Sequence, residues 1–299
     1  MLNLHGIFPP VATPFTERGD LDLDALQFNA HRWMQTRLRG LVVLGTNGEA
    51  AYLDGDESEA VVAAARACMP ADRTLVAGTG HDATRQTIRA CERAAKAGAD
   101  AVLVRTPGAF KGLMTGEAFV RHFRAVADAS PVPVLLYNFA NNFGVNMPTS
   151  AIVALAEHPN IVGMKESGGD ISQINEQVGA TPARFEVVVG SAPSLYASLC
   201  VGAVGGVVAL ANVAPDACVA LYDHAVAGRH AEALAQQRAI TPLAVAVTGK
   251  HGVPGLKAAM TLAGYRGGFP RSPLAPAPQA VVDDLRATID RLHAAPGLA

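Results

Sequence analysis

The chain has 299 residues, of which 50% are hydrophobic and 17% are charged, so it is a globular protein rather than a disordered one. That length is enough for one large hydrophobic core or for two ordinary domains. The net charge of −2, with no block of lysines or arginines, gives no electrostatic reason to expect nucleic acid or an anionic membrane as a partner.

Short apolar runs alternate with amphipathic stretches over the first two thirds of the chain. Such alternation predicts strands and helices in turn, and eight units fit a (β/α)8 TIM barrel, which we assign to residues 1–213. An open doubly wound sheet is the structural alternative, although no G-x-G-x-x-G fingerprint follows the first strand. The predicted strands are Ile7–Ala12, Leu41–Leu44, Thr74–Ala77, Ala101–Val104, Val132–Tyr137, Ile161–Lys165, Glu186–Val189 and Val204–Ala209. Predicted helices between them include Asp22–Thr36, Asp56–Cys68, Ala83–Lys96, Gly116–Ala127 and Thr149–Ala156.

From residue 214 to residue 299 the pattern is helical only. We expect this segment to be an α-helical extension packed on the barrel, because it is short for an independent domain. Lys257, which falls in this segment, is interpreted as a solvated or capping residue. The predicted helices are Asp216–Ala227, His230–Val247, Val253–Leu262 and Gln279–Ala294, with the Pro-rich segment Phe269–Pro278 between the last two.

The stretch Val187–Pro215 carries no charge and is long enough to span a bilayer. Its glycines, Pro193 and Asn212 favour instead a strand, a helix and a strand inside a barrel. The first residues lack the basic start and apolar stretch of a signal peptide. We therefore expect a cytoplasmic protein without a membrane segment.

The cysteines are widely spaced and lie among helix formers, which is typical of small core residues in a reduced compartment. Neither the four cysteines nor the nine histidines show the spacing of metal ligands, so we expect no metal site. The cysteines are Cys68, Cys91, Cys200 and Cys218.

Lys165 ends a predicted buried strand and is followed by a Gly-rich turn. A basic side chain is rarely buried unless it is paired or functional. A desolvated lysine can act as a neutral amine and attack a carbonyl, so the first hypothesis is a Schiff-base lysine. The alternative is a lysine at a strand end whose ammonium reaches solvent.

The ends of other predicted strands carry further candidate residues, because the active site of a barrel forms at the carboxyl ends of its strands. Thr46 and Asn47 in Gly45–Glu49 could hold a carboxylate with backbone N–H groups, or form an ordinary capped loop. Tyr137 could relay protons, or simply place its hydroxyl at the wet rim. The glycines of Gly202–Val208 are interpreted as packing residues, with a backbone–ligand contact or a phosphate site as the alternative.

The order of these motifs, GTNGE, then Tyr-Asn, then GMKESGGD, resembles the dihydrodipicolinate synthase/N-acetylneuraminate lyase family over nearly the whole chain. Within that family, GMKESGGD, GAVGGVVALANV and GVPGLKAAM are most similar to the 4-hydroxy-2-oxoglutarate aldolase branch. Aldolases of 2-keto-3-deoxy sugar acids are also close to it.

The resemblance implies a class I aldolase in which Lys165 forms an imine with pyruvate, so that no metal or other cofactor is required. Tyr137 would pass protons, while Thr46 and Asn47 would bind the pyruvate carboxylate. The backbone carbonyl of Val207 would lie near the imine, and Ser167 would contact the distal part of the substrate. The family pattern also implies a homotetramer built as a dimer of dimers.

Three positions depart from the family pattern. Asn142 stands where the synthases place an arginine, and a neutral amide cannot form the bidentate ion pair that arginine forms. Ala109 stands where a relay tyrosine reaches across a subunit boundary. Asn47 replaces the usual second hydroxyl residue after the second strand. Asn142 argues against dihydrodipicolinate synthase and for the aldolase branch, in which Asn142 would belong to the substrate site.

The sequence therefore predicts a lyase that cleaves a 4-hydroxy-2-oxo acid to pyruvate and an aldehyde such as glyoxylate. The first alternative is an aldolase or dehydratase of a 2-keto-3-deoxy sugar acid. The second, from another class, is a protein that binds a 2-oxo acid without turnover, which the absence of a phenol at Ala109 keeps open.

Overall fold

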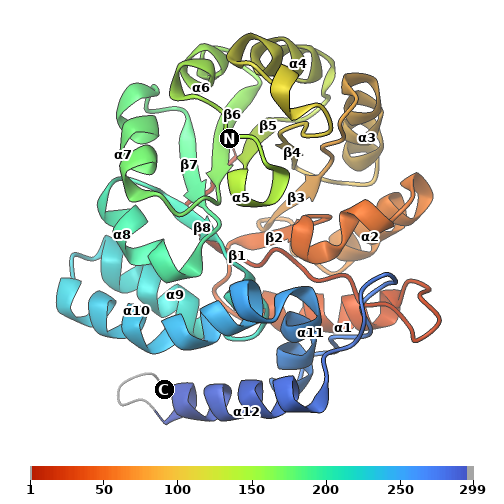
Figure 1. The fold of residues 1–299 in the computed structure, drawn as a ribbon, viewed down its shortest axis with the longest axis vertical. Coiled ribbons are helices and arrows are strands. Elements are labelled where there is room, and N and C mark those ends of the chain that lie inside the picture. Colours follow the sequence, from red (N-terminus) through yellow and green to blue (C-terminus); the bar gives the residue numbers. More distant parts are fainter. Residues whose placement is uncertain (1, 295–299) are drawn as a thin grey trace.

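The computed structural model describes residues 2–294, and its eight parallel strands form a barrel within a ring of helices (Figure 1). Strands β2 to β8 pair in chain order, β8 pairs with β1, and a bridge between Pro10 and Val42 joins the two ends of the sheet. The predicted TIM barrel is confirmed. The strands are β1 (Gly6–Phe8), β2 (Gly40–Val43), β3 (Thr74–Gly78), β4 (Ala101–Arg105), β5 (Val134–Asn138), β6 (Ile161–Glu166), β7 (Glu186–Val189) and β8 (Gly205–Val207).

Side-chain caps mark the start of some of the helices that follow the strands. Asp54 and Glu57 form a capping box at the start of one helix, and the side chains of Thr115 and Asp170 cap two others. The helices within the barrel are α1 (Leu23–Met34), α2 (Gly55–Ala67), α3 (Thr84–Lys96), α4 (Gly116–Ala129), α5 (Ala140–Phe143), α6 (Thr149–Ala156), α7 (Ile171–Ala180) and α8 (Leu195–Cys200).

The core has two layers, as expected for strands that carry side chains on both faces. Leu103, Leu135 and Val188 belong to the cluster that fills the barrel interior. A larger cluster lies between the strands and the helices and includes Trp33, Phe119 and Phe123.

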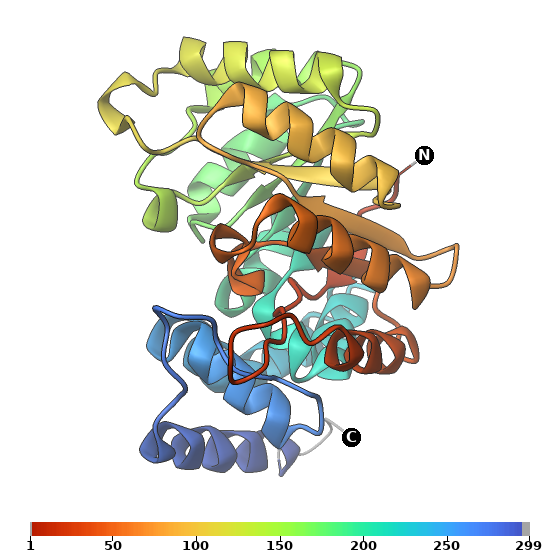
Figure 2. The same cartoon turned by 90° about the vertical axis from the view of Figure 1, so that its right-hand side faces the viewer.

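The segment after β8 is helical and comprises α9 (Pro215–Val226), α10 (His230–Val245), α11 (Gly252–Leu262) and α12 (Gln279–His293). Helix α9 contacts β1 and α8, so it lies on the barrel, whereas α11 and α12 gather at one side of the molecule (Figure 2). The division at residue 213 stays a prediction.

The uncharged stretch Val187–Pro215 contains β7, α8 and β8, as predicted, followed by a short 3-10 turn. None of the helices within residues 2–294 combines the length and the apolar character needed to span a membrane. The interpretation of all four cysteines as core residues was wrong for Cys200, which is exposed, whereas Cys91 and Cys218 are buried.

Candidate active site

Lys165 lies at the carboxyl end of β6 and is buried, with 4% of its surface exposed. Its Nζ lies 4.5 Å from the centroid of the Tyr137 ring. Among residues 2–294 no carboxylate lies at ion-pair distance from Nζ. The side chain therefore does not extend into solvent, as the alternative interpretation expected, but ends against the face of an aromatic ring.

The neighbouring strand places Tyr137 directly beside Lys165. The two residues are paired in the register of β5 and β6, so their side chains share the interior face of the barrel. The Tyr137 hydroxyl lies 3.4 Å from the hydroxyl of Thr46, which follows β2. Phe139 and Phe143 pack around the same ring, with centroids at 6.2 and 5.5 Å. A phenol held in this way can exchange a proton with a group bound between Lys165 and Thr46.

A cavity of about 750 Å³ runs from the carboxyl ends of β2 to β5 outward between α2 and α3, and we call it the mouth cavity. Thr46, Tyr137, Asn142 and Arg105 are among the residues that line it. Lys165 lies below, where it borders a small void of about 10 Å³ inside the barrel together with Val207. Tyr137 thus lies between the lysine and the open cavity.

Ser167 and Gly190 border the space beside Lys165. The Ser167 Oγ is buried and has no hydrogen-bond partner among the described residues. A Cβ added at Gly190 would lie 1.9 Å from that Oγ and 2.9 Å from Lys165 Cε. Only a glycine therefore leaves room at this position for both side chains, and no sequence pattern indicated this requirement.

The structure thus brings together five of the seven predicted site residues: Lys165 and Tyr137 with Thr46, Ser167 and Val207. Asn142 lines the mouth cavity from the short helix α5. Asn47 follows Thr46 in a 3-10 turn but does not line that cavity.

Glu166 fixes the backbone around Lys165 and Tyr137. It is buried on the opposite face of β6 from Lys165, and its carboxylate accepts hydrogen bonds from Asn138 Nδ2 (2.7 Å), the Gly168 N–H (2.7 Å) and Gln177 Nε2 (3.3 Å). Burial raises the pKa of this carboxyl, and the hydrogen bonds oppose that shift. Because Asn138 follows Tyr137, this one carboxylate ties the end of β5 to the turn after β6.

The interpretation of Lys257 as a solvated or capping residue was wrong. This lysine of α11 is 1% exposed, and its Nζ lies 2.5 Å from Glu49 Oε1 and donates to the Phe269 carbonyl (2.6 Å). Burial lowers the pKa of Lys257, and Glu49 opposes that shift. A lysine within the apolar run Gly255–Met260 was the signal that it needs a buried partner.

Glu49 ends the loop that carries Thr46 and adopts a left-handed conformation, with φ 55°. Its second carboxylate oxygen accepts the Arg271 N–H at 2.8 Å, and the Arg271 guanidinium pairs with Glu57 of α2. The C-terminal segment is therefore bonded to the loop after β2, and these contacts hold a backbone that a non-glycine residue rarely adopts.

Comparisons with known proteins identify the family and the fold of the chain. The model of the Dihydrodipicolinate synthetase family matches residues 3–292. A protein of Emericella nidulans, "Probable 4-hydroxy-2-oxoglutarate aldolase, mitochondrial", is 36% identical over 88% of this chain and 85% of its own length. A 4-hydroxy-tetrahydrodipicolinate synthase of an Exiguobacterium species is 35% identical over 91% of this chain and 92% of its own length.

Solved structures show the same architecture. The 4-hydroxy-tetrahydrodipicolinate synthase of Methylacidiphilum fumariolicum superposes with a TM-score of 0.92 at 29% identity, over 98% of this chain and 97% of that one. YagE, an E. coli K12 protein of the same family solved in complex with pyruvate, gives a TM-score of 0.91 at 27% identity, over 98% and 99% of the two chains.

Proposed function

Because the chain belongs to the dihydrodipicolinate synthetase family, and is therefore a lyase, we propose that it is a class I aldolase that cleaves a 4-hydroxy-2-oxo acid to pyruvate and an aldehyde. The observation that carries the proposal is the buried Lys165, which has no carboxylate partner within residues 2–294 and whose Nζ lies against the Tyr137 ring. A lysine so placed suits attack on a carbonyl more than an ion pair.

In the proposed reaction, Lys165 attacks the C2 carbonyl and water leaves, which forms an imine. Tyr137 removes the proton of the C4 hydroxyl as the C3–C4 bond breaks, and the electron pair moves into the protonated imine, which becomes an enamine. The aldehyde departs, C3 takes up a proton, and water hydrolyses the imine to release pyruvate. Since the imine nitrogen serves as the electron sink, the proposal requires no metal.

The surrounding groups suit the rest of the substrate. Thr46, whose hydroxyl reaches Tyr137, would bind the C1 carboxylate with backbone N–H groups of its loop, and Asn47 would complete this loop. The Val207 carbonyl would lie near the imine, and the unpaired Ser167 hydroxyl would contact the part of the substrate beyond C4.

Asn142 supports the choice of an aldolase over dihydrodipicolinate synthase. Its side chain lies at the mouth cavity, where a guanidinium would pair with the carboxylate of aspartate semialdehyde. An amide lacks the charge for that pair, so we propose lyase chemistry on a hydroxy-oxo acid.

The second candidate function is an aldolase or dehydratase of a 2-keto-3-deoxy sugar acid. Two polar groups support it, because the Ser167 hydroxyl, which has no partner among the described residues, and the Asn142 amide could bind the hydroxyls of a longer substrate. The same imine at Lys165 would serve that reaction.

The proposal includes a homotetramer and a reducing compartment such as the cytoplasm. Cys68, Cys91, Cys200 and Cys218 are all free thiols, which suits that compartment. Because Ala109 cannot donate a proton, the proposed relay uses Tyr137 and Thr46 of a single subunit.

The test is pyruvate release, followed with lactate dehydrogenase, from 4-hydroxy-2-oxo acids and 2-keto-3-deoxy sugar acids, beside a synthase assay with aspartate semialdehyde. Cleavage of the 4-hydroxy-2-oxo acids by the wild type, and none by Lys165→Ala, is the expected result. Preference for the sugar acids would select the second candidate. Synthase activity, or tight binding of 2-oxo acids with no turnover, would contradict both.

A further inference from the structure

Arg105 ends β4 in the same layer of the barrel as Lys165 and Tyr137. Arg105 is paired with Tyr137 in the register of β4 and β5, and Tyr137 is paired with Lys165 in the next strand pair. Parallel strands in register direct paired side chains to the same face, so the three residues form a row across the barrel mouth. Arg105 also lines the mouth cavity together with Tyr137 and Asn142.

Two neighbours shape the path of the Arg105 side chain. A Cβ added at Gly80, which follows β3, would lie 2.6 Å from Arg105 Cγ, so the side chain crosses a gap that only glycine provides. The guanidinium then lies over the Phe143 ring, with its central carbon 5.3 Å from the ring centroid. Phe143 is the residue after Asn142, so Arg105 lies next to the position where synthases place their arginine.

Asp82 binds the edge of the Arg105 guanidinium that is formed by Nη1 and Nη2. Nη2 donates to Asp82 Oδ2 at 2.9 Å and Nη1 to Oδ1 at 3.4 Å, while Nη1 also donates to the Thr106 carbonyl at 3.0 Å. Arg105 lowers the pKa of Asp82 to about 2, so this carboxylate is charged. Asp82 itself is not among the residues that line the mouth cavity.

The edge formed by Nε and Nη2 still has N–H groups that are free to donate among the described residues. No acceptor within residues 2–294 is bonded to Nε–H, and Nη2 has a second N–H beside it. These two parallel N–H groups are the fork that binds a carboxylate with two hydrogen bonds. Because Asp82 already fixes the side chain, binding a second carboxylate costs little further rotamer entropy.

On the basis of the proposed function, we propose that Arg105 binds a carboxylate at the distal end of the substrate and so selects a 4-hydroxy-2-oxo dicarboxylic acid. Arg105 performs from β4 the role that Asn142 cannot perform from α5. The aldehyde product would then carry a carboxylate, as glyoxylate does.

The test compares two substrates that differ only at the distal end. 4-Hydroxy-2-oxoglutarate carries the carboxylate, and 4-hydroxy-2-oxopentanoate carries a methyl group in its place. The ratio of their kcat/KM values for pyruvate release is the measured selectivity. We expect the wild type to favour the diacid, and Arg105→Gln to reduce this ratio by about 10- to 100-fold through a higher KM for the diacid.

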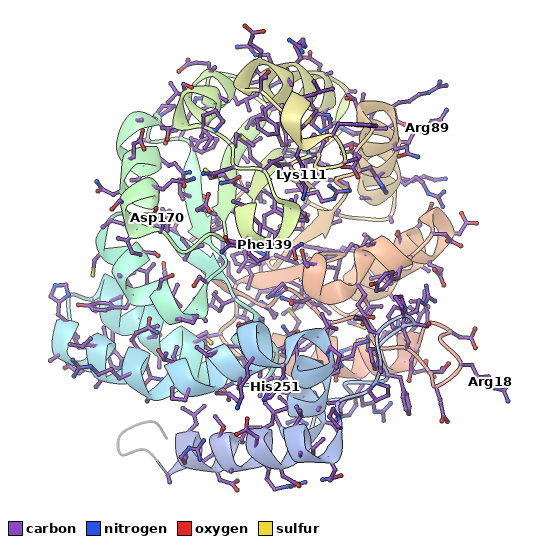
Figure 3. The ribbon with its side chains drawn as sticks, viewed as in Figure 1. Arg18, Arg89, Lys111, Phe139, Asp170 and His251 are labelled. Carbon is purple, nitrogen blue, oxygen red and sulfur yellow. The ribbon has the colours of Figure 1, made fainter. Side chains whose placement is uncertain are left out.

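Two further variants separate substrate binding from support of the loop. Asp82→Asn keeps an acceptor for the Gly108 and Ala109 N–H groups, which lie 2.7 and 3.0 Å from Asp82 Oδ1, and it keeps Arg105 itself with a looser hold. The ratio should therefore fall less than in Arg105→Gln. Lys111 is an exposed lysine near Gly144 and does not line the mouth cavity; it is labelled in Figure 3. Lys111→Gln removes this cation and should leave the ratio unchanged.

Equal losses with both substrates in Arg105→Gln, or a ratio that falls as far in Asp82→Asn as in Arg105→Gln, would show that Arg105 only supports the loop and would overturn the inference. That result, with pyruvate release intact in the wild type, leaves the proposed aldolase standing. A wild type that releases no pyruvate from either substrate refutes the proposed function instead.

Discussion

At the scale of single residues, the contrast between two buried lysines supports Lys165 as the proposed nucleophile. Lys257 lies against Glu49 at 2.5 Å and therefore belongs to an ion pair. Lys165 faces the Tyr137 ring at 4.5 Å, with no carboxylate partner among the described residues. Burying a lysine without an ion-pair partner destabilises the fold. Such a lysine is therefore more typical of a functional site than of a purely structural position.

Replacing Tyr137 with phenylalanine tests the proton relay. The ring against Lys165 Nζ would be kept, whereas the hydroxyl 3.4 Å from Thr46 would be lost. We expect kcat for pyruvate release to fall by about 10²- to 10⁴-fold, because the proton of the C4 hydroxyl loses its acceptor, while the melting temperature changes little. A variant with the wild-type kcat would remove Tyr137 from the mechanism.

Replacing Gly190 with alanine tests how tightly the lysine is enclosed. The new Cβ would collide with Ser167 Oγ and Lys165 Cε, so we expect kcat/KM to fall by at least about 10-fold and stability by about 1–3 kcal/mol. Gly179→Ala in α7 is the matched control, since no described atom outside the backbone of its own helix lies within 4 Å of the added Cβ and alanine favours the helix. Equal behaviour of the two variants in steady-state kinetics would refute the close contact.

At the scale of elements, helix α11 and the segment after it are bonded to the loop that carries Thr46. Helix α11 supplies Lys257, and the segment after it supplies Arg271, both to Glu49 at the end of the GTNGE loop. The extension thus contributes to the loop that carries Thr46, although it lies outside the ring of strands.

Removing one member of the Lys257–Glu49 pair leaves a buried charge. Lys257→Ala should therefore destabilise the fold by about 3–5 kcal/mol in urea unfolding and raise KM for the substrate. The double variant Glu49→Gln/Lys257→Met, which removes both charges, should lose distinctly less stability. If the single and double variants unfold at the same urea concentration, the pair has no net role.

Sequence patterns predicted the strands and helices better than they predicted the contacts between distant residues. The alternation of apolar runs and amphipathic stretches located all eight strands, because that periodicity is local. The strand-end position likewise selected Lys165 and Tyr137. The Lys257–Glu49 contact was missed because its members lie 208 positions apart, and Gly190 and Arg105 were missed because only packing shows what a side chain there would meet.

At the scale of the whole molecule, His122 links the fold to pH. This histidine of α4 is 7% exposed, and its Nδ1 lies 2.9 Å from the Thr84 hydroxyl. Burial, followed by the Arg105 charge, lowers its pKa from 6.5 to about 4, so the folded protein keeps His122 neutral where the unfolded chain binds a proton.

Stability from His122 is therefore present above pH 6.5 and is lost as the pH falls from about 6.5 to about 4, by about 3 kcal/mol at most. We expect urea midpoints of the wild type to decrease over this range more steeply than those of His122→Gln. Parallel curves for the two proteins would show that His122 does not lose its proton on folding.

The most direct test of the central claim is to trap the imine at Lys165. Reduction with borohydride in the presence of pyruvate, followed by peptide mass analysis, should show a stable three-carbon adduct on the peptide that contains Lys165, and none in Lys165→Ala. An unmodified Lys165, together with wild-type activity in Lys165→Ala, would contradict the account.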